Sequence, residues 1–221
     1  MKSIKVILFD WDGTLIDSLS VKAQNAGRLF AQVWGLEPAS VTRSYLKHSG
    51  IPRRQLFNAI LADHGLPPLA EDRFTELSQQ FSTLNLECLY DKKILSAKTR
   101  EALQKLTEAG FRLYISSSAE AAEIEQIAEK IGIRQYFQEI LGSKGEFTKG
   151  IPHVKYVLQQ EDRKADEVTF VGDDLADMRL GNEAGIMTIG KSGTQPPSLL
   201  KAAGAQKTID EIAELLDLLS N

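Results

Sequence analysis

Short apolar runs rich in β-branched residues recur along this chain, and most of them are separated by helical patterns. The first run, residues 4–9, has no helical spacing, which is typical of a strand buried on both faces of a sheet. Similar runs follow at residues 112–116, 139–141, 168–171 and 187–189. Strands that alternate with helices favour a parallel sheet with right-handed crossovers and helices on both faces. We therefore expect an α/β core with a doubly wound, Rossmann-like parallel sheet.

The helical patterns are clearest in two segments that lie between expected strands. Residues 99–109 place their apolar side chains on one face and are followed by Gly110, a common residue at helix ends. Residues 119–131 repeat this arrangement and are followed by Gly132. Near the end of the chain, residues 209–219 have an amphipathic pattern that predicts a single closing helix.

One long stretch, residues 16–92, breaks the alternation because it contains no strand-like run. It shows helical stripes of apolar residues instead, and glycine and proline interrupt these stripes at residues 50–52 and 65–68. The stripes are explained by packing within a helical unit. We expect an all-helical subdomain formed by residues 16–92, inserted into a core domain formed by residues 1–15 and 93–221.

Composition argues against several classes of protein. Hydrophobic residues make up 43% and charged residues 25% of the 221 residues, as in ordinary soluble globular proteins. The net charge of -4 disfavours a nucleic-acid surface, which needs clustered lysine and arginine. No stretch approaches the roughly 20 apolar residues that span a bilayer, and the single Cys88 allows no intrachain disulfide. We expect a cytoplasmic monomer or homodimer that binds neither nucleic acid nor membrane.

Acidic residues follow directly on two of the expected strands. Asp10 and Asp12 come after the first strand, and Asp173 and Asp177 come after the strand at residues 168–171. A single acidic group can be a solvated turn, but two such groups at the ends of neighbouring strands would meet and repel one another. Carboxylate oxygens are the ligands that a hard cation such as Mg²⁺ prefers. The two groups together therefore predict a magnesium site.

The chain resembles the haloacid dehalogenase superfamily in four motifs. Residues 7–15, ILFDWDGTL, resemble the first of these motifs. The later ones resemble, in order, the serines at residues 116–118, Lys149 ahead of a helical segment, and VGDDLAD at residues 171–177. The helical insertion is similar to the cap of the phosphoglycolate phosphatase-like and β-phosphoglucomutase-like branch. The resemblance runs from residue 4 to about residue 190 and is specific, because the motifs agree in type, order and context.

This resemblance implies roles for the acidic residues. Asp10 would be the nucleophile that attacks phosphorus, forming an aspartyl-phosphate that water then hydrolyses. Asp12 would protonate the leaving alcohol and later activate the water. Mg²⁺ would be held by the side chains of Asp10 and Asp173 and by the backbone carbonyl of Asp12. Asp177 would be a further ligand through water or a support for the lysine of the third motif, and Asp174 would face solvent or orient a metal-bound water.

The resemblance also implies hydroxyl groups that bind the phosphate. Ser117 is the expected residue. Ser116 and Ser118 are alternatives, because in a run of three serines the motif can be aligned one residue earlier or later. Thr14 would bind phosphate through its hydroxyl or its amide. Each of the three serines could instead cap the helix expected to begin near residue 119.

Three basic residues complete the expected substrate site. Lys149 would contact the phosphoryl group and the nucleophile. Lys144 is the alternative, because the usual family pattern has a proline soon after this lysine, whereas here Gly150 and Ile151 separate Lys149 from Pro152. In the helical insertion, Arg53 and Arg54 would bind the part of the substrate beyond its phosphate. A planar guanidinium suits a carboxylate or a second phosphate at that position.

The sequence therefore predicts a Mg²⁺-dependent phosphatase that hydrolyses a small-molecule phosphate monoester and resembles phosphoglycolate phosphatase. Asp12 disfavours a carbon–halogen hydrolase, which lacks the second aspartate of the first motif. A phosphomutase similar to β-phosphoglucomutase shares both aspartates and is the main alternative. A P-loop nucleotide-binding protein is a remote one, because residues 185–192, GIMTIGKS, match G-x-x-x-x-G-K-[ST]. There the expected strand lies inside the motif, whereas a true P-loop follows its strand and opens a helix.

Overall fold

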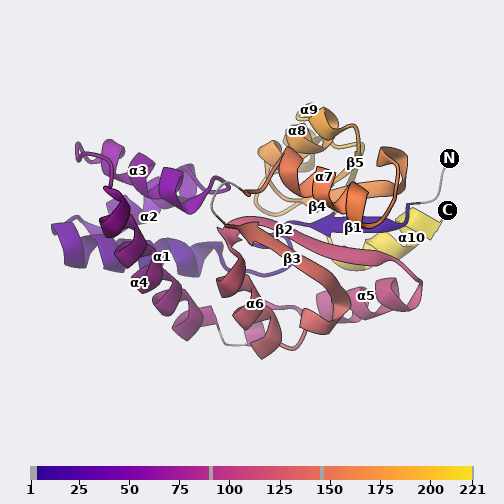
Figure 1. The fold of residues 1–221 in the computed structure, drawn as a ribbon, viewed down its shortest axis with the longest axis horizontal. Coiled ribbons are helices and arrows are strands. Elements are labelled where there is room, and N and C mark those ends of the chain that lie inside the picture. The colour runs from indigo at the N-terminus through magenta and orange to yellow at the C-terminus, as the bar shows by residue number, and fades with distance from the viewer. Residues whose placement is uncertain (1–3, 90–91, 145–146, 221) are drawn as a thin grey trace.

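The structure, a computed structural model, describes residues 4–89, 92–144 and 147–220 (Figure 1). Its centre is a parallel sheet of six strands in the order β3-β2-β1-β4-β5-β6. The strands are β1 Val6–Phe9, β2 Arg112–Glu120, β3 Phe137–Ser143, β4 Val168–Gly172, β5 Met187–Lys191 and β6 Lys207–Ile209. All five expected strands are present, and β6 was not predicted.

The first strand lies in the middle of the sheet and is buried along its whole length. Phe9, its last residue, is paired with Ile115 of β2 on one side and with Val171 of β4 on the other. The order of the strands reverses around β1, and ligands of doubly wound sheets bind at such a switch point, beyond the carboxyl ends of the strands. The segments that follow β1, β2 and β4 therefore meet at one edge.

Helices cover both faces of the sheet (Figure 1). Alternate side chains of β1 point to opposite faces, so that Ile7 and Phe9 pack in one apolar cluster while Val6 and Leu8 pack in another. The helices of the core are α5 Ala97–Glu108, α6 Ala121–Lys130, α7 Ile151–Gln160, α8 Leu175–Ala184, α9 Pro197–Ala202 and α10 Leu215–Ser220. The cluster around Ile7 and Phe9 includes residues of α5, α6 and α10, and the cluster around Val6 and Leu8 includes residues of α7.

Four further helices lie together beyond the carboxyl edge of the sheet, at the left of Figure 1. They are α1 Leu19–Trp34, α2 Pro38–Lys47, α3 Arg53–Asp63 and α4 Glu71–Leu89, and we call residues 19–89 the cap. The cap has its own apolar cluster, built around Phe30, Phe57 and Phe81. The predicted boundary between residues 92 and 93 stays a prediction, and residues 90–91 beside it lie outside the described part.

The tail differs from the single helix expected over residues 209–219. Ile209 is the last residue of β6 and pairs with Lys191 of β5 at the edge of the sheet. A carboxylate oxygen of Glu214 then accepts hydrogen bonds from the backbone amides of Asp210 and Glu211, at 2.9 and 2.7 Å, and a new helical turn begins there. The amphipathic pattern was therefore correct only for its second half. The 3₁₀ turns are η1 Lys92–Ile94, η2 Arg134–Tyr136, η3 Ala165–Glu167 and η4 Ile212–Glu214.

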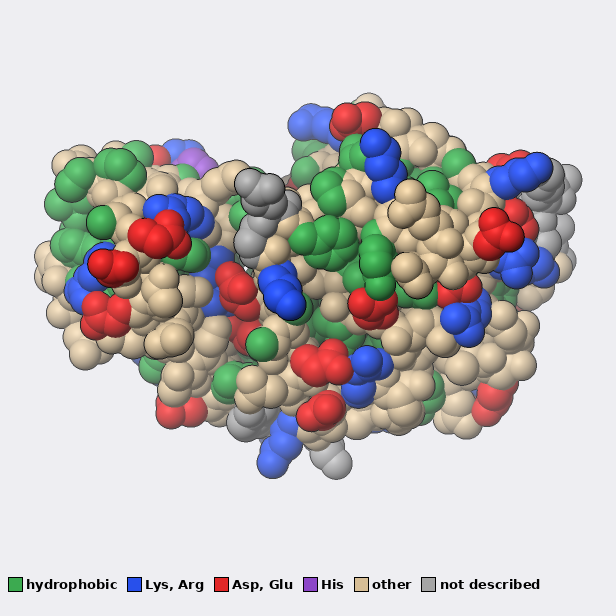
Figure 2. Space-filling model, in the orientation of Figure 1, with side chains coloured by type: hydrophobic (Ala, Val, Ile, Leu, Met, Phe, Trp, Pro, Cys, Tyr) green, Lys and Arg blue, Asp and Glu red, His purple; other side chains and the backbone are tan. Residues whose placement is uncertain are grey.

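The surface agrees with the balanced composition of the chain. Acidic and basic side chains are interspersed over the cap and the core on the face drawn in Figure 2. Within the described residues, no helix is both long enough and apolar enough to cross a membrane.

Candidate active site

A small pocket of about 60 Å³ lies between the carboxyl edge of the sheet and the cap. The core and the cap both contribute charged side chains to its walls. The residues discussed below that line it are Asp10, Asp12, Lys22, Tyr45, Arg53, Ser117, Ser118, Lys149, Asp173 and Asp174. Most of the residues singled out in the sequence are therefore brought together.

Asp10 stands at the end of β1, where its backbone amide donates a 2.9 Å hydrogen bond to the carbonyl of Val171. One carboxylate oxygen of Asp10 accepts a hydrogen bond from the ammonium group of Lys149 at 2.8 Å. Burial raises the pKa of Asp10 well above its usual value; Lys149 opposes this shift, and the neighbouring Asp177 and Asp173 add to it. The negative charge of Asp10 is therefore disfavoured by burial and by two like charges, and Lys149 offsets only part of this effect.

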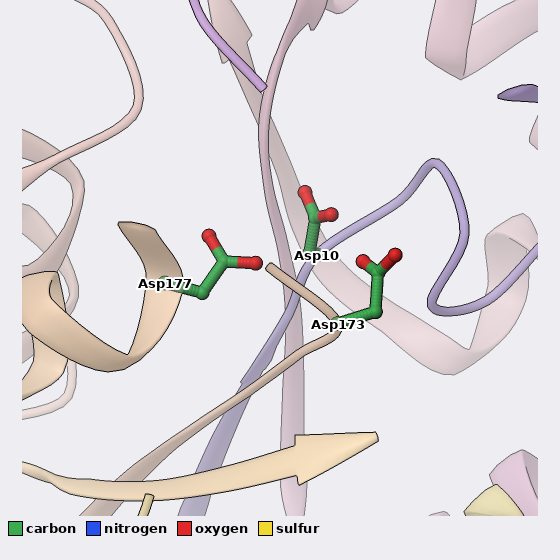
Figure 3. Close-up of side chains that lie close together, drawn as sticks. All are labelled: Asp10, Asp173 and Asp177. Atoms are coloured by element: carbon green, nitrogen blue, oxygen red, sulfur yellow. The ribbon is translucent and has the colours of Figure 1, made fainter. Parts of the chain in front are cut away.

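Figure 3 shows the carboxylates of Asp10, Asp173 and Asp177 converging from three different segments. Each offers one oxygen, and these oxygens all lie within 4.8 Å of one another. All three side chains are buried, and Lys149 supplies one positive charge against three negative ones. The Oδ2 atom of Asp177 is buried and has no hydrogen-bond partner among the described residues. A buried cluster of oxygen ligands with excess negative charge fits a metal ion.

Two glycines leave the space that these carboxylates occupy. Gly13 has a φ of +83°, and a Cβ atom there would lie 2.3 Å from Oδ2 of Asp173. At Gly172 a Cβ atom would lie 2.2 Å from Oδ2 of Asp177. Thr14 also belongs to this packing, because its hydroxyl group donates a 2.8 Å hydrogen bond to Oδ1 of Asp173. The hydroxyl of Thr14, one of the two groups through which this residue was expected to bind phosphate, therefore contacts an acidic residue; the role of its amide stays a prediction.

The three serines at residues 116–118 all belong to β2, but each has a different environment. The hydroxyl of Ser116 lies 3.0 Å from Nδ1 of His153, on the side of the sheet that α7 covers. Ser117 and Ser118 line the pocket, and Ser117 is buried while Ser118 donates a 2.7 Å hydrogen bond to the carbonyl of Gly50 in the cap. The geometry thus favours Ser117 over Ser116 as a phosphate-binding residue, because successive side chains of a strand point to opposite faces.

The two candidate lysines are also separated by the structure. Lys144 is exposed, and its backbone pairs with Phe147 in an isolated bridge. Lys149 is buried, and its ammonium group lies 2.8 Å from Asp10 and 2.5 Å from Asp177. Burial alone would lower the pKa of Lys149, but Asp10 and Asp177 outweigh that effect and raise it above its usual value.

Asp12 lines the same pocket as Asp10 and Asp173, but its partners differ from theirs. Its carboxylate accepts hydrogen bonds from the hydroxyl of Ser18 and from the ammonium group of Lys22, the latter at 2.8 Å. Lys22 belongs to α1 of the cap, and its side chain is only 2% exposed. Burial favours the neutral amine, but Asp12 and Glu123 together raise the pKa of Lys22 above its usual value. A cap residue thus contacts a core carboxylate at the pocket.

Arg53 and Arg54 of the cap were both expected near the substrate, but of these two only Arg53 lines the pocket. Its guanidinium group is buried and donates to Glu123 at 2.6 Å and to Ser82 at 2.7 Å. Arg54 instead forms an ion pair with Glu71 and lies over the ring of Phe74, with 5.1 Å between the guanidinium carbon and the ring centroid. Consecutive residues of a helix face different directions, so that α3 directs only one of the two side chains to the pocket.

The sequence reasoning missed the buried polar residues behind the pocket. Lys22 and Asn25 lie on the same face of α1 as the buried Ala26 and Leu29, so polar residues interrupt an apolar stripe. Glu123 is likewise buried on the inner face of α6. Polar residues on a buried helical face were the signal that could have indicated these positions.

The P-loop alternative is excluded by the structure. Gly185 ends α8 in the left-handed conformation, and β5 runs through the middle of the motif. Lys191 is the last residue of β5, and the next helix begins only at Pro197. The strand and the helix therefore lie in the wrong places for a phosphate-binding loop of that type.

The parallel sheet, the carboxylate cluster at its switch point and the helical cap define a Rossmann-like α/β protein with a capped acidic site. Residues 7–191 match the model of the family described as haloacid dehalogenase-like hydrolase. The chain belongs to this family, as its motifs had indicated.

Proteins that match this chain over nearly their whole length support this assignment. The chain is 26% identical to a phosphoglycolate phosphatase of Vibrio parahaemolyticus, over 99% of this chain and 97% of the relative. It is 28% identical to a phosphoglycolate phosphatase of Chromobacterium violaceum, over 100% and 99% of the two chains. A crystal structure described as a predicted phosphoglycolate phosphatase from Haemophilus somnus has the same fold, with a TM-score of 0.82, 24% identity and 99% of each chain covered. The protein is thus a phosphatase of the haloacid dehalogenase-like family.

Proposed function

We propose that this phosphatase hydrolyses a small-molecule phosphate monoester with the help of Mg²⁺, through an aspartyl-phosphate on Asp10. The observation that carries the proposal is the position of Asp10, which lines the pocket while Lys149 holds one of its carboxylate oxygens at 2.8 Å. A carboxylate fixed in this way is a nucleophile that needs no separate base. The curated relatives named phosphoglycolate phosphatase support a small ester as the substrate.

In the proposed reaction, a carboxylate oxygen of Asp10 attacks phosphorus and the bond to the leaving alcohol breaks. Asp12 gives a proton to the departing oxygen and then takes one from the water that cleaves the aspartyl-phosphate. Ser18 and Lys22 hold the carboxylate of Asp12 beside the pocket. The hydroxyl of Ser117, together with Lys149, would bind the oxygens of the transferred phosphoryl group.

The proposed Mg²⁺ site consists of the carboxylates of Asp10, Asp173 and Asp177 and the backbone carbonyl of Asp12. The excess negative charge of the buried cluster and the unpartnered Oδ2 of Asp177 support this assignment. When bound, the ion would offset the repulsion between the substrate phosphate and the attacking carboxylate. Asp174 caps its own helix through the amide of Ala176, at 2.7 Å, and is not needed as a ligand.

The nucleophile is tested with the variant Asp10→Asn. We expect kcat for p-nitrophenyl phosphate in the presence of Mg²⁺ to fall by more than about a thousandfold, as when a nucleophile is removed from other covalent enzymes. Rapid acid quenching of the parent with ³²P-labelled substrate should trap a labelled protein that the variant does not form. The exposed Asp17, replaced by asparagine, is the matched control and should keep both properties.

Full turnover in Asp10→Asn would refute the mechanism, whatever the metal. The metal site has a separate readout: Asp173→Asn should weaken Mg²⁺ binding in titration calorimetry, and unaltered affinity would count against the site. The phosphomutase alternative predicts isomerised ester as the main product, in place of inorganic phosphate.

A further inference from the structure

The carboxylate of Glu123 lies behind the cap side of the pocket. Its side chain extends from α6 of the core and is fully buried. It contacts two cations of the cap, with 3.2 Å to the ammonium group of Lys22 and 2.6 Å to the guanidinium group of Arg53. The hydroxyl of Ser82 and the amide of Asn85 donate to it as well, at 2.9 and 3.2 Å.

This carboxylate is ionised at neutral pH. Burial alone would raise the pKa of Glu123, but Lys22 and then Arg53 outweigh that effect and lower it to about 2. A buried carboxylate with two cationic partners is a fixed negative charge and not a reserve of protons.

The cations on the cap side of the pocket are therefore already paired. Lys22 and Arg53 are the two cations that the cap contributes to the pocket lining; Glu123 contacts both of them, and the carboxyl group of Asp12 contacts Lys22. Arg53 is engaged further, because its Nη1 atom donates to Ser78 and Ser82 while Nη2 donates to Glu123. Neither cation is available to a second anionic group on a substrate.

An anionic leaving group would lose its water in this pocket without gaining a free cation, which is unfavourable. An uncharged alcohol meets a more suitable surface. Leu19, Leu56 and Phe81 supply apolar contacts, and the hydroxyl of Tyr45 can donate or accept a hydrogen bond. Burial raises the pKa of Tyr45 above its usual value, so that this hydroxyl stays neutral.

We propose that Glu123 is a specificity-determining residue: it neutralises the cap side of the pocket, so that esters of small uncharged alcohols are preferred to esters bearing a carboxylate or a second phosphate. This inference rests on the proposed phosphatase function and narrows its substrate class. It also revises the expectation that Arg53 binds an anionic group of the substrate.

The test compares two esters of similar size, 2-hydroxyethyl phosphate and phosphoglycolate, in the presence of Mg²⁺. For the parent we expect kcat/KM to be higher for the uncharged 2-hydroxyethyl ester. Glu123→Gln keeps the shape of the side chain but leaves Lys22 and Arg53 without their shared counter-ion. The ratio of the two kcat/KM values should then shift toward phosphoglycolate by about ten- to a hundredfold, the value of a charge-assisted contact.

A matched control comes from the same helix. Glu125→Gln removes a carboxylate that pairs with Arg134 at 2.5 Å, away from the pocket, and should leave the ratio unchanged. A second variant, Ser49→Lys, adds a cation to the pocket wall without touching the buried network. It should shift the ratio in the same direction as Glu123→Gln, and it decides the matter if that variant does not fold.

Three results would overturn the inference. The first is a parent that prefers phosphoglycolate, and the second is a folded Glu123→Gln that keeps the parent's ratio. The third, for use where Glu123→Gln does not fold, is a Ser49→Lys variant with the parent's ratio. In each case the esters are still hydrolysed and the proposed phosphatase function survives. Failure of the parent to release phosphate from either ester would instead overturn that function, and the inference with it.

Discussion

Ser116 and Ser117 are adjacent in the sequence and identical in chemistry, yet they face opposite sides of β2. Ser117 lines the pocket, whereas Ser116 contacts His153. We expect Ser117→Ala to lower kcat/KM by about ten- to a hundredfold through the loss of a hydrogen bond to a charged phosphoryl group. Ser116→Ala should leave kcat/KM unchanged and lower the free energy of unfolding by about 1 kcal/mol. Steady-state kinetics and urea unfolding measure the two effects, and equal kinetic losses in both variants would contradict this distinction.

At the scale of single residues, the sequence predicted the part of the site that follows the strands. Asp10, Asp173 and Lys149 could be found because each lies next to a recognisable element and because the family motifs agree with their spacing. Lys22 and Glu123 could not, since long polar side chains on helices are usually solvated. Only the placement of the cap against α6 of the core brings these two residues to 3.2 Å from one another.

Among the elements, α7 carries a buried histidine, His153, that should make the free energy of unfolding depend on pH. Burial, followed by the charge of Lys149, lowers the pKa of His153 from 6.5 to about 4. As the pH falls from about 6.5 to 4, the unfolded chain therefore binds a proton that the folded chain does not, and stability decreases by up to about 3 kcal/mol. His153→Gln should remove this part of the decrease in urea unfolding between pH 7 and 4.

If His153→Gln and the parent lose stability in parallel over this range, the histidine is not the group responsible.

The elements themselves were predictable where their patterns were long. Five strands and the helices α5 and α6 were expected from runs of apolar residues with clear spacing. The last strand, β6, has only three residues, which is too short for any periodicity to appear. The turn that separates it from α10 depends on one contact, in which Glu214 accepts from two backbone amides.

On the scale of the whole molecule, Glu123 joins the cap to the core through ion pairs that acid should weaken. The pKa of Glu123 is lowered from 4.5 to about 2, so its contribution is complete above pH 4.5 and is lost as the pH falls toward 2. Between pH 6.5 and 3 we expect the parent to lose about 2 kcal/mol more than Glu123→Gln does in urea unfolding. Parallel losses in the two proteins would contradict this, and Glu125→Gln should behave like the parent.

The sequence indicated a sheet with a helical insertion, because the pattern of apolar residues changes after β1 from a strand-like run to helical spacing. The placement of the cap over the pocket was not visible, since it depends on contacts between distant segments. The contact between Ser118 and the carbonyl of Gly50, at 2.7 Å, is one of these, and the pair of Arg53 with Glu123 is another.

Glu123, the counter-ion that Lys22 and Arg53 share, constrains how this sequence can evolve. Loss of Glu123 alone would remove the ion-pair partner of the buried Arg53 and leave Lys22 with Asp12 alone, and loss of Lys22 or Arg53 alone would leave Glu123 with one of its two cationic partners. Single substitutions at these positions are therefore costly, whereas compensating changes in the cap and the core are tolerable. Among related phosphatases, the residues aligned with Glu123 should covary with those aligned with Lys22 and Arg53. Relatives with an uncharged residue at the position of Glu123 would then have either no cations at the positions of Lys22 and Arg53 or a cation there that binds an anionic substrate.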